Sequence, residues 1–130
     1  MGAALPEFVR RLLDANTFVV LSTINPDGSP QSSVIWAKGD GDDIVFSTIL
    51  GRRKTRNIER NPRVSLCGFD PADPYDYFEV RGTVSMTRDG GPELIEELSQ
   101  RYDGVSFRES RPDNVRVVCR VTPTKVILHV

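Results

Sequence analysis

Residues 77–87 show the strictest pattern in the chain, because apolar and polar side chains alternate along the whole segment. The residues that share the apolar face are Phe78, Val80, Gly82, Val84 and Met86. A period of two is typical of a β-strand with one buried face. Gly82, in the middle of that face, predicts a bulge or a close approach of a neighbouring backbone. The segment therefore predicts a long strand of an antiparallel sheet.

Short β-branched and aromatic segments separated by turn residues recur through the rest of the chain. They predict strands over residues 18–24, 31–38, 43–48, 63–69, 114–122 and 124–130, the first three forming a meander and the last two joined at Pro123. Apolar spacing predicts a helix over residues 6–15. Further helices are expected over residues 53–60, which end at Asn61-Pro62, and over 92–104, which begin with acidic residues, and polar loops over 70–74 and 105–113. About six or seven antiparallel strands with three small helices favour a small barrel, since closure removes unpaired edges.

Composition limits the classes of protein that this chain can represent. With 130 residues we expect one domain over residues 1–130. The net charge of −1 argues against general binding of nucleic acid. No apolar run approaches the about 20 residues needed to cross a bilayer, and residues 1–16 lack the pattern of a signal peptide. We therefore expect a cytoplasmic protein. Cys67 and Cys119 are expected to be buried free thiols, and one His with two separated Cys predicts no metal site.

A basic cluster follows the predicted strand 43–48. Gly51 breaks the strand, and Arg52, Arg53, Lys54 and Arg56 enter the first turn of the predicted helix. Cations at a helix N-terminus oppose the helix dipole, so this placement costs stability unless an anion joins them. Free backbone N–H groups together with Arg and Lys side chains form a phosphate site. The alternative interpretation is a solvated basic helix face.

Several motifs in order along the chain resemble one known family. They are Ile24-Asn-Pro-Asp-Gly-Ser-Pro30, Trp36, Phe46-Ser-Thr48, Gly51-Arg-Arg-Lys-Thr-Arg-Asn57 and Asn61-Pro-Arg-Val-Ser65. The pattern resembles the pyridoxamine 5′-phosphate oxidase-like split β-barrel superfamily, and above all its flavin/deazaflavin oxidoreductases that use coenzyme F420. The resemblance implies a mainly β, FMN-binding-like split barrel and a homodimer with cofactor sites at the subunit interface.

The resemblance also implies roles for individual residues. Arg52 and Lys54 would bind the cofactor phosphate, helped by Thr55 and the amides of the helix start, with Asn57 supporting that turn. Ser47 and Thr48 would line the floor beneath the tricyclic ring. Val34, Ile35 and Trp36 would lie opposite, although Trp36 is equally consistent with core or interface packing. Tyr75 and Tyr77 would come from the second subunit, or would be ordinary interface aromatics.

The function implied is an F420H2-dependent reductase that transfers hydride to a small organic acceptor. FMN shares the tricycle and the ribityl phosphate, so an FMN-binding oxidoreductase is the alternative, and a non-catalytic F420- or tetrapyrrole-binding protein is another. No acid–base constellation is visible, which suits a reaction carried by a cofactor. Catalytic residues therefore stay unassigned, and residues 70–76 and 105–113 are candidate pocket walls. A nucleic-acid module is disfavoured, because no aromatic residues interleave with the basic cluster.

Overall fold

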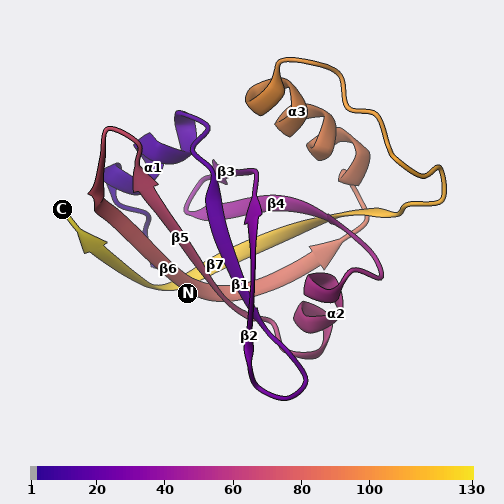
Figure 1. Cartoon of the computed structure of the whole chain (residues 1–130), viewed down its shortest axis with the longest axis horizontal. Coiled ribbons are helices and arrows are strands. Elements are labelled where there is room, and N and C mark those ends of the chain that lie inside the picture. Colours follow the sequence, from indigo (N-terminus) through magenta and orange to yellow (C-terminus); the bar gives the residue numbers. More distant parts are fainter. Residues whose placement is uncertain (1–2) are drawn as a thin grey trace.

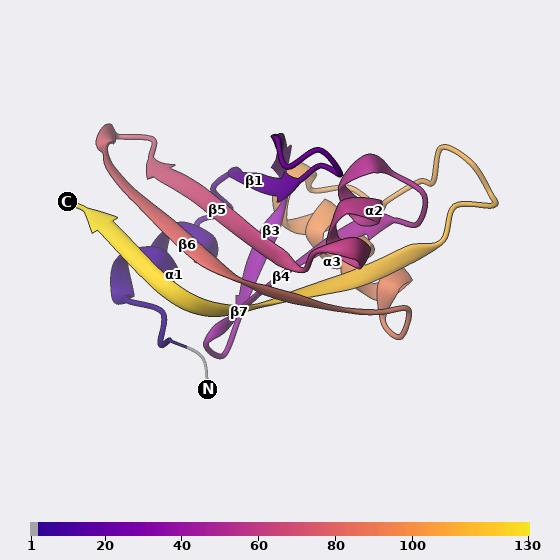
Figure 2. The same ribbon diagram turned by 90° about the horizontal axis from the view of Figure 1, so that it is seen from below.

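The computed structural model describes residues 3–130, so the first two residues of the predicted domain lie outside it. Within these residues seven antiparallel strands form one sheet in the order β2-β1-β5-β6-β7-β4-β3. The strands are β1 (Val19–Ile24), β2 (Pro30–Ile35), β3 (Ala37–Asp40), β4 (Asp43–Ile49), β5 (Arg63–Asp70), β6 (Asp73–Thr87) and β7 (Arg116–His129). Figure 1 and Figure 2 show this sheet strongly curled. The predicted fold class, a split β-barrel with small helices, is confirmed.

The sheet curls because its two edge strands are consecutive in the sequence. β2 pairs with β1 and β3 pairs with β4, and only Trp36 separates β2 from β3. The prediction of one continuous strand over residues 31–38 is therefore wrong. The pairings of the predicted meander are present, because residues 30–35 pair with β1 and residues 37–40 pair with β4. Tyr102 holds the bend: its ring stacks on Trp36 at 5.5 Å, and its hydroxyl accepts a hydrogen bond from Ala37 N at 3.2 Å. The single bent segment brings both edges of the sheet together.

β6 and β7 are the longest strands, and their backbones approach each other closely at Gly82 in β6. A Cβ on Gly82 would lie 2.4 Å from the carbonyl oxygen of Thr122. The register shifts here, because Gly82 pairs with Pro123 while Arg81 pairs with Lys125, which leaves Thr124 as an extra residue. The predicted bulge or close approach is thus present. The prediction of two strands joined at Pro123 is wrong, because β7 runs through Pro123 as one strand. The proline is tolerated there, since the pairing of β7 with β4 ends at Val121 and Pro123 therefore removes no hydrogen bond to β4.

The expected loop over residues 70–74 is shorter than predicted. Asp70 pairs with Asp73 across a two-residue turn, so Pro74 lies within β6 beside a register shift. Cys67 is exposed, which corrects the expectation that both thiols are buried, whereas Cys119 is buried and also free. Burial raises the pKa of the Cys119 thiol to about 12, so it stays protonated at neutral pH.

Three helices pack around the sheet within the described residues. α1 (Glu7–Asp14) lies against β3 and β5, α2 (Arg53–Arg60) against β1, and α3 (Gly91–Asp103) against β4 and β7. Apolar side chains of α1 and of the inner sheet face form the main core, which includes Leu13, Phe46 and Phe78. In residues 3–130 no helix is long and apolar enough to cross a membrane. α2 and α3 lie on either side of the end of β4 (Figure 1).

Gly82→Ala tests the close approach of β6 and β7. The added methyl group meets backbone rather than a flexible side chain, so we expect a loss of about 1–3 kcal/mol in unfolding free energy, measured by urea denaturation. Gly39→Ala is the matched control, because its Cβ would meet only Leu13 at 3.7 Å. Equal stability of the two variants would contradict the packing described for Gly82.

Candidate functional site

The start of α2 is set by the residues that connect it to β4. Gly51 adopts a φ of +96°, which L side chains rarely adopt, and it turns the chain away from the strand. Arg52 then stands at the N-cap in an extended conformation, and α2 begins at Arg53 without a side-chain cap. The amide N–H groups of residues 53–55 have no acceptor among the described residues. These donors are available to an anion.

Buried polar side chains attach α2 to the sheet. The Thr55 hydroxyl donates to the carbonyl of Ile49 at 2.7 Å and lies 3.0 Å from the Thr48 hydroxyl. Asn57 Nδ2 donates to Thr23 Oγ1 at 3.0 Å and to Asn25 Oδ1 at 2.9 Å. The side chains of Thr48, Thr55 and Asn57 are therefore occupied by the fold itself. Their predicted cofactor roles stay predictions, and what the structure shows is that they fix the position of α2.

The cations at the start of α2 have no carboxylate partner. Within residues 3–130 no ion pair includes Arg52, Arg53, Lys54 or Arg56. Burial, and next the charge of Arg52, lower the pKa of Lys54 below its usual 10.5. A partly buried ammonium without a counter-ion is unfavourable in the protein alone. An anion bound here would relieve that cost.

Five predicted residues line a cavity of about 210 Å³ beside this cluster. They are Val34, Ile35, Trp36, Ser47 and Lys54. Residues from β2, the Trp36 bend, β4, α2 and α3 thus converge on one space, with Phe18 and Phe107 adding aromatic walls. Trp36 both lines the cavity and stacks on Tyr102, so it is at once a packing residue and a wall. The geometry suits a planar ring next to an anion.

Arg52 lines a different cavity from the one that Lys54 lines. A second cavity of about 420 Å³ is lined by Gly51 and Arg52, and by Arg111, Asp113 and Asn114 of the loop before β7. The first turn of α2 therefore faces two hollows, with a cation on each. Residues 105–113 contribute to both cavities, as predicted for a pocket wall, whereas residues 70–76 line neither of them.

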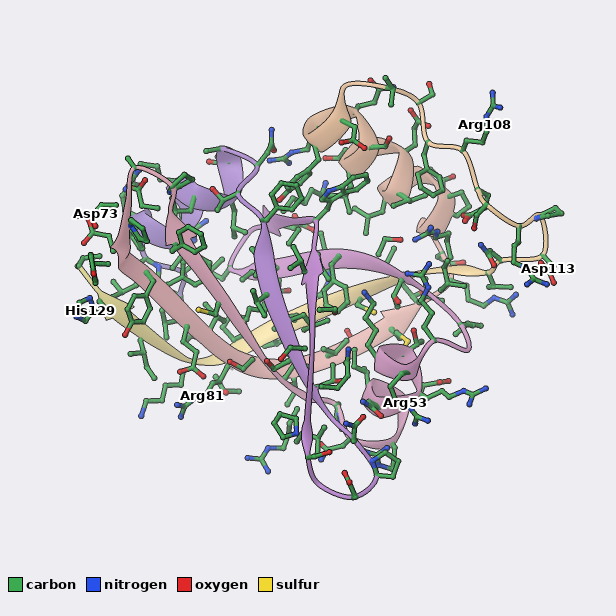
Figure 3. The ribbon with its side chains drawn as sticks, viewed as in Figure 1. Arg53, Asp73, Arg81, Arg108, Asp113 and His129 are labelled. Carbon is green, nitrogen blue, oxygen red and sulfur yellow. The ribbon has the colours of Figure 1, made fainter. Side chains whose placement is uncertain are left out.

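Tyr75 and Tyr77 lie at the opposite end of the sheet from α2. Figure 3 shows this separation through the labels of Asp73 and His129 on one side and Arg53 on the other. Tyr75 is 79% exposed, and Tyr77 stacks on His129 at 4.9 Å. The structure does not bring these tyrosines to the cavity of their own chain. A role from a second subunit stays a prediction.

Sequence reasoning missed Arg116, which is the second cation of the cavity. Its Nε donates to Glu109 Oε2 at 2.8 Å, and its Nη1 lies 3.4 Å from Ser47 Oγ. Phe107 lies over the guanidinium at 4.7 Å. The signal is not local, because Arg116 reaches the cavity only through the pairing of β7 with β4. No group of three potential metal ligands occurs within residues 3–130.

Comparison with known proteins agrees with this architecture. A family model described as pyridoxamine 5′-phosphate oxidase matches residues 5–130. The chain belongs to this oxidoreductase family. The predicted family resemblance is confirmed.

Individual relatives differ in how much they share with the chain. It is 42% identical over 87 residues to the pyridoxine/pyridoxamine 5′-phosphate oxidase of Rubrobacter xylanophilus, a match that covers 66% of the chain and 40% of that protein. The oxidase of Aeromonas hydrophila is 41% identical over 51 residues, which cover 38% of the chain and 24% of that protein. The chain therefore spans less than half the length of these curated family relatives.

Two solved structures are similar to this chain in three dimensions. An F420 reductase has 37% sequence identity and a TM-score of 0.84, with 95% of this chain and 98% of that chain covered. General Stress Protein 26 from Bacillus anthracis has 21% identity and a TM-score of 0.72, with 95% and 92% covered. The second likeness shows the family fold alone. The first joins the fold to substantial sequence similarity along nearly the whole chain.

Lys54→Met tests the electrostatics at the start of α2. Because the folded pKa is lowered, the unfolded chain binds more protons between the folded value and 10.5, and stability rises with pH across that window. We expect the variant apoprotein to resist urea better than the natural chain at about pH 7, with a smaller difference near about pH 10. A variant that is less stable at both values would contradict the desolvation of Lys54.

Proposed function

We propose that this chain is an F420H2-dependent reductase that transfers a hydride to a small organic acceptor. The observation that carries the proposal is the set of cations and free amides at the start of α2, next to a cavity with aromatic walls. A ligand with a phosphate and a planar ring matches both parts. The 37% identity with an F420 reductase over 95% of the chain supports the deazaflavin as that ligand.

The residues present fit such a cofactor. Lys54 and the amides of residues 53–55 would hold the phosphate, with Arg52 contributing from the neighbouring hollow. The walls formed by Val34, Ile35, Trp36 and Ser47 would bind the ring. When bound, the cofactor supplies the hydride, and the protein supplies position and electrostatics. Phosphate binding would also favour the charged form of Lys54, since a nearby anion raises the pKa of an ammonium.

The proposal includes a homodimer with the cofactor site completed by the second subunit. An exposed row crosses the outer face of the sheet, where Val34 pairs in register with Val20 and Val20 with Cys67. Val34 is 65% exposed and also lines the cavity, so the exposed row is continuous with the site. Covering it with a second copy would bury apolar surface and close the cavity to water. Tyr75 and Tyr77 of that copy are then the candidates for an outer wall.

FMN is the alternative cofactor. It carries the same tricyclic frame and ribityl phosphate, so Lys54 and the helix-start amides would bind it in the same way. The similarity to pyridoxine/pyridoxamine 5′-phosphate oxidases over 66% of the chain favours keeping this alternative.

Equilibrium binding of F420 and FMN to the apoprotein distinguishes the two cofactors. We expect micromolar or tighter F420 binding and weaker FMN binding. The reverse order would assign the chain to FMN, and binding of neither would sink the proposed activity.

Lys54→Gln and Arg52→Gln should weaken cofactor binding. Each removes a charged hydrogen-bond donor, which is worth about 1.5–3 kcal/mol, so affinity should fall roughly ten- to hundredfold. Arg56→Gln is the matched control, because it removes a charge from the same helix at an exposed position that lines neither hollow. The measurement is fluorescence titration with the cofactor. Unchanged affinity in both site variants would show that the phosphate binds elsewhere.

A further inference from the structure

The Arg116 side chain is held from three sides at the edge of the cavity. Its guanidinium contacts Glu109 through two nitrogens at 2.8 and 3.2 Å, and Ser47 Oγ through a third at 3.4 Å. Phe107 covers one face of the group. The side chain is only 11% exposed. Such a buried arrangement fixes the guanidinium, because few rotamers keep all these contacts.

The contacts of Arg116 leave part of its hydrogen-bond capacity unused within the described residues. Arginine has five N–H donors, and three of them are used by Glu109 and Ser47. The other two have no acceptor among the described residues, although Arg116 lines the cavity that Lys54 also lines. The planar fork of a guanidinium matches oxygen pairs on flat ligands. The cavity thus has a second donor group, separate from the free amides at the start of α2.

We propose that Arg116 is a second anion-binding residue of this cavity and selects a planar ligand with an oxyanion or imide-type oxygen. The proposal rests on the proposed function for the identity of the phosphate-bearing ligand, but not for the role of Arg116. The oxygen belongs either to the ring of the bound cofactor or to a carboxylate, enolate or phenolate acceptor. Both sources offer the same chemistry to the guanidinium.

Glu109 is the built-in competitor for Arg116. Its carboxylate neutralises the guanidinium, and hydrogen bonding to Arg116 lowers the pKa of Glu109 below its ordinary value. The Asn114 side chain donates to the same carboxylate at 3.0 Å. Removing the charge of Glu109 therefore releases Arg116 for a ligand, whereas removing Arg116 abolishes the site. The two variants change anion affinity in opposite directions, which a purely structural pair would not do.

The test uses Trp36 fluorescence, because Trp36 is the only tryptophan in the chain and lines the cavity. Benzoate is the anionic probe and benzamide the neutral control. Each probe is titrated into apoprotein in the presence of saturating inorganic phosphate. Each is also titrated into protein loaded with F420 or FMN, whichever of the two binds. We expect Arg116→Gln to weaken benzoate binding by about ten- to hundredfold and Glu109→Gln to strengthen it. Benzamide should respond little to either variant.

Two further variants keep the result interpretable. Arg108→Gln is the control for charge removal, since Arg108 is exposed in the same loop and lines neither hollow. The double variant Arg116→Gln/Glu109→Gln leaves no unpaired charge if Arg116→Gln alone fails to fold. In that double variant, benzoate affinity should fall by the same factor that is expected for Arg116→Gln alone.

The outcomes separate the sources of the oxygen. Weaker cofactor binding in Arg116→Gln, with benzoate competing against the cofactor, assigns the oxygen to the cofactor ring. Unchanged cofactor affinity with weaker benzoate binding to the loaded protein assigns it to the acceptor. Benzoate affinity that Arg116→Gln leaves unchanged, or that both single variants lower together, overturns the proposal. If neither cofactor binds the natural chain, the proposed function fails while the apoprotein titration still reports on Arg116.

Discussion

The attachment of α2 to the sheet by buried hydrogen bonds is the constraint on which the candidate site depends. Thr55 bonds to the end of β4, and Asn57 bonds to Thr23 in β1 and to Asn25 in the turn that follows it. Leaving any of these buried groups unpaired would cost about 1–3 kcal/mol. The helix start is thus fixed in position and orientation. The amides at the helix start can lack hydrogen-bond acceptors, and the cations can lack carboxylate partners, only because buried hydrogen bonds hold the rest of the helix in place.

The site stores an electrostatic cost that a ligand would recover. Each cation near a helix N-terminus costs about 0.3–1 kcal/mol, and Lys54 in addition loses solvation. Arg120, by contrast, pairs with both Asp40 and Asp43. A cluster of cations without ion pairs, next to free helix-start amides, is what a binding site for an anion requires. Arg116 is likewise only partly compensated, because its partner Glu109 accepts from only two of its N–H groups.

Features set by local sequence were predictable. The bounds of α2, residues 53–60, follow from Gly51 and from the Asn61-Pro62 stop, and the close approach at Gly82 follows from a glycine within an alternating strand. The convergence of Trp36, Ser47 and Lys54 on one cavity followed from the family resemblance, not from periodicity. The exposure of Cys67 was readable as well, since Val64, Leu66 and Gly68 occupy the buried face of β5.

Features set by long-range pairing were not predictable. The break at Trp36 depends on Tyr102, which lies far along the chain in α3. Arg116 joins the site only because β7 pairs with β4, and nothing around it in the sequence resembles a motif. Pro123 looked like the end of a strand, because one sequence does not show that β4 stops pairing two residues earlier. Such contacts are properties of the sheet order.

The most direct test of the account is a residue-resolved titration of ¹⁵N-labelled apoprotein with the cofactor that binds. If the start of α2 and the adjoining cavity form the site, the largest amide shifts will fall on residues 53–55. The Trp36 indole and Ser47 should shift with them at the same ligand concentrations. Shifts confined to the outer sheet face around Arg63 and Lys125, where another hollow lies, would contradict the central claim.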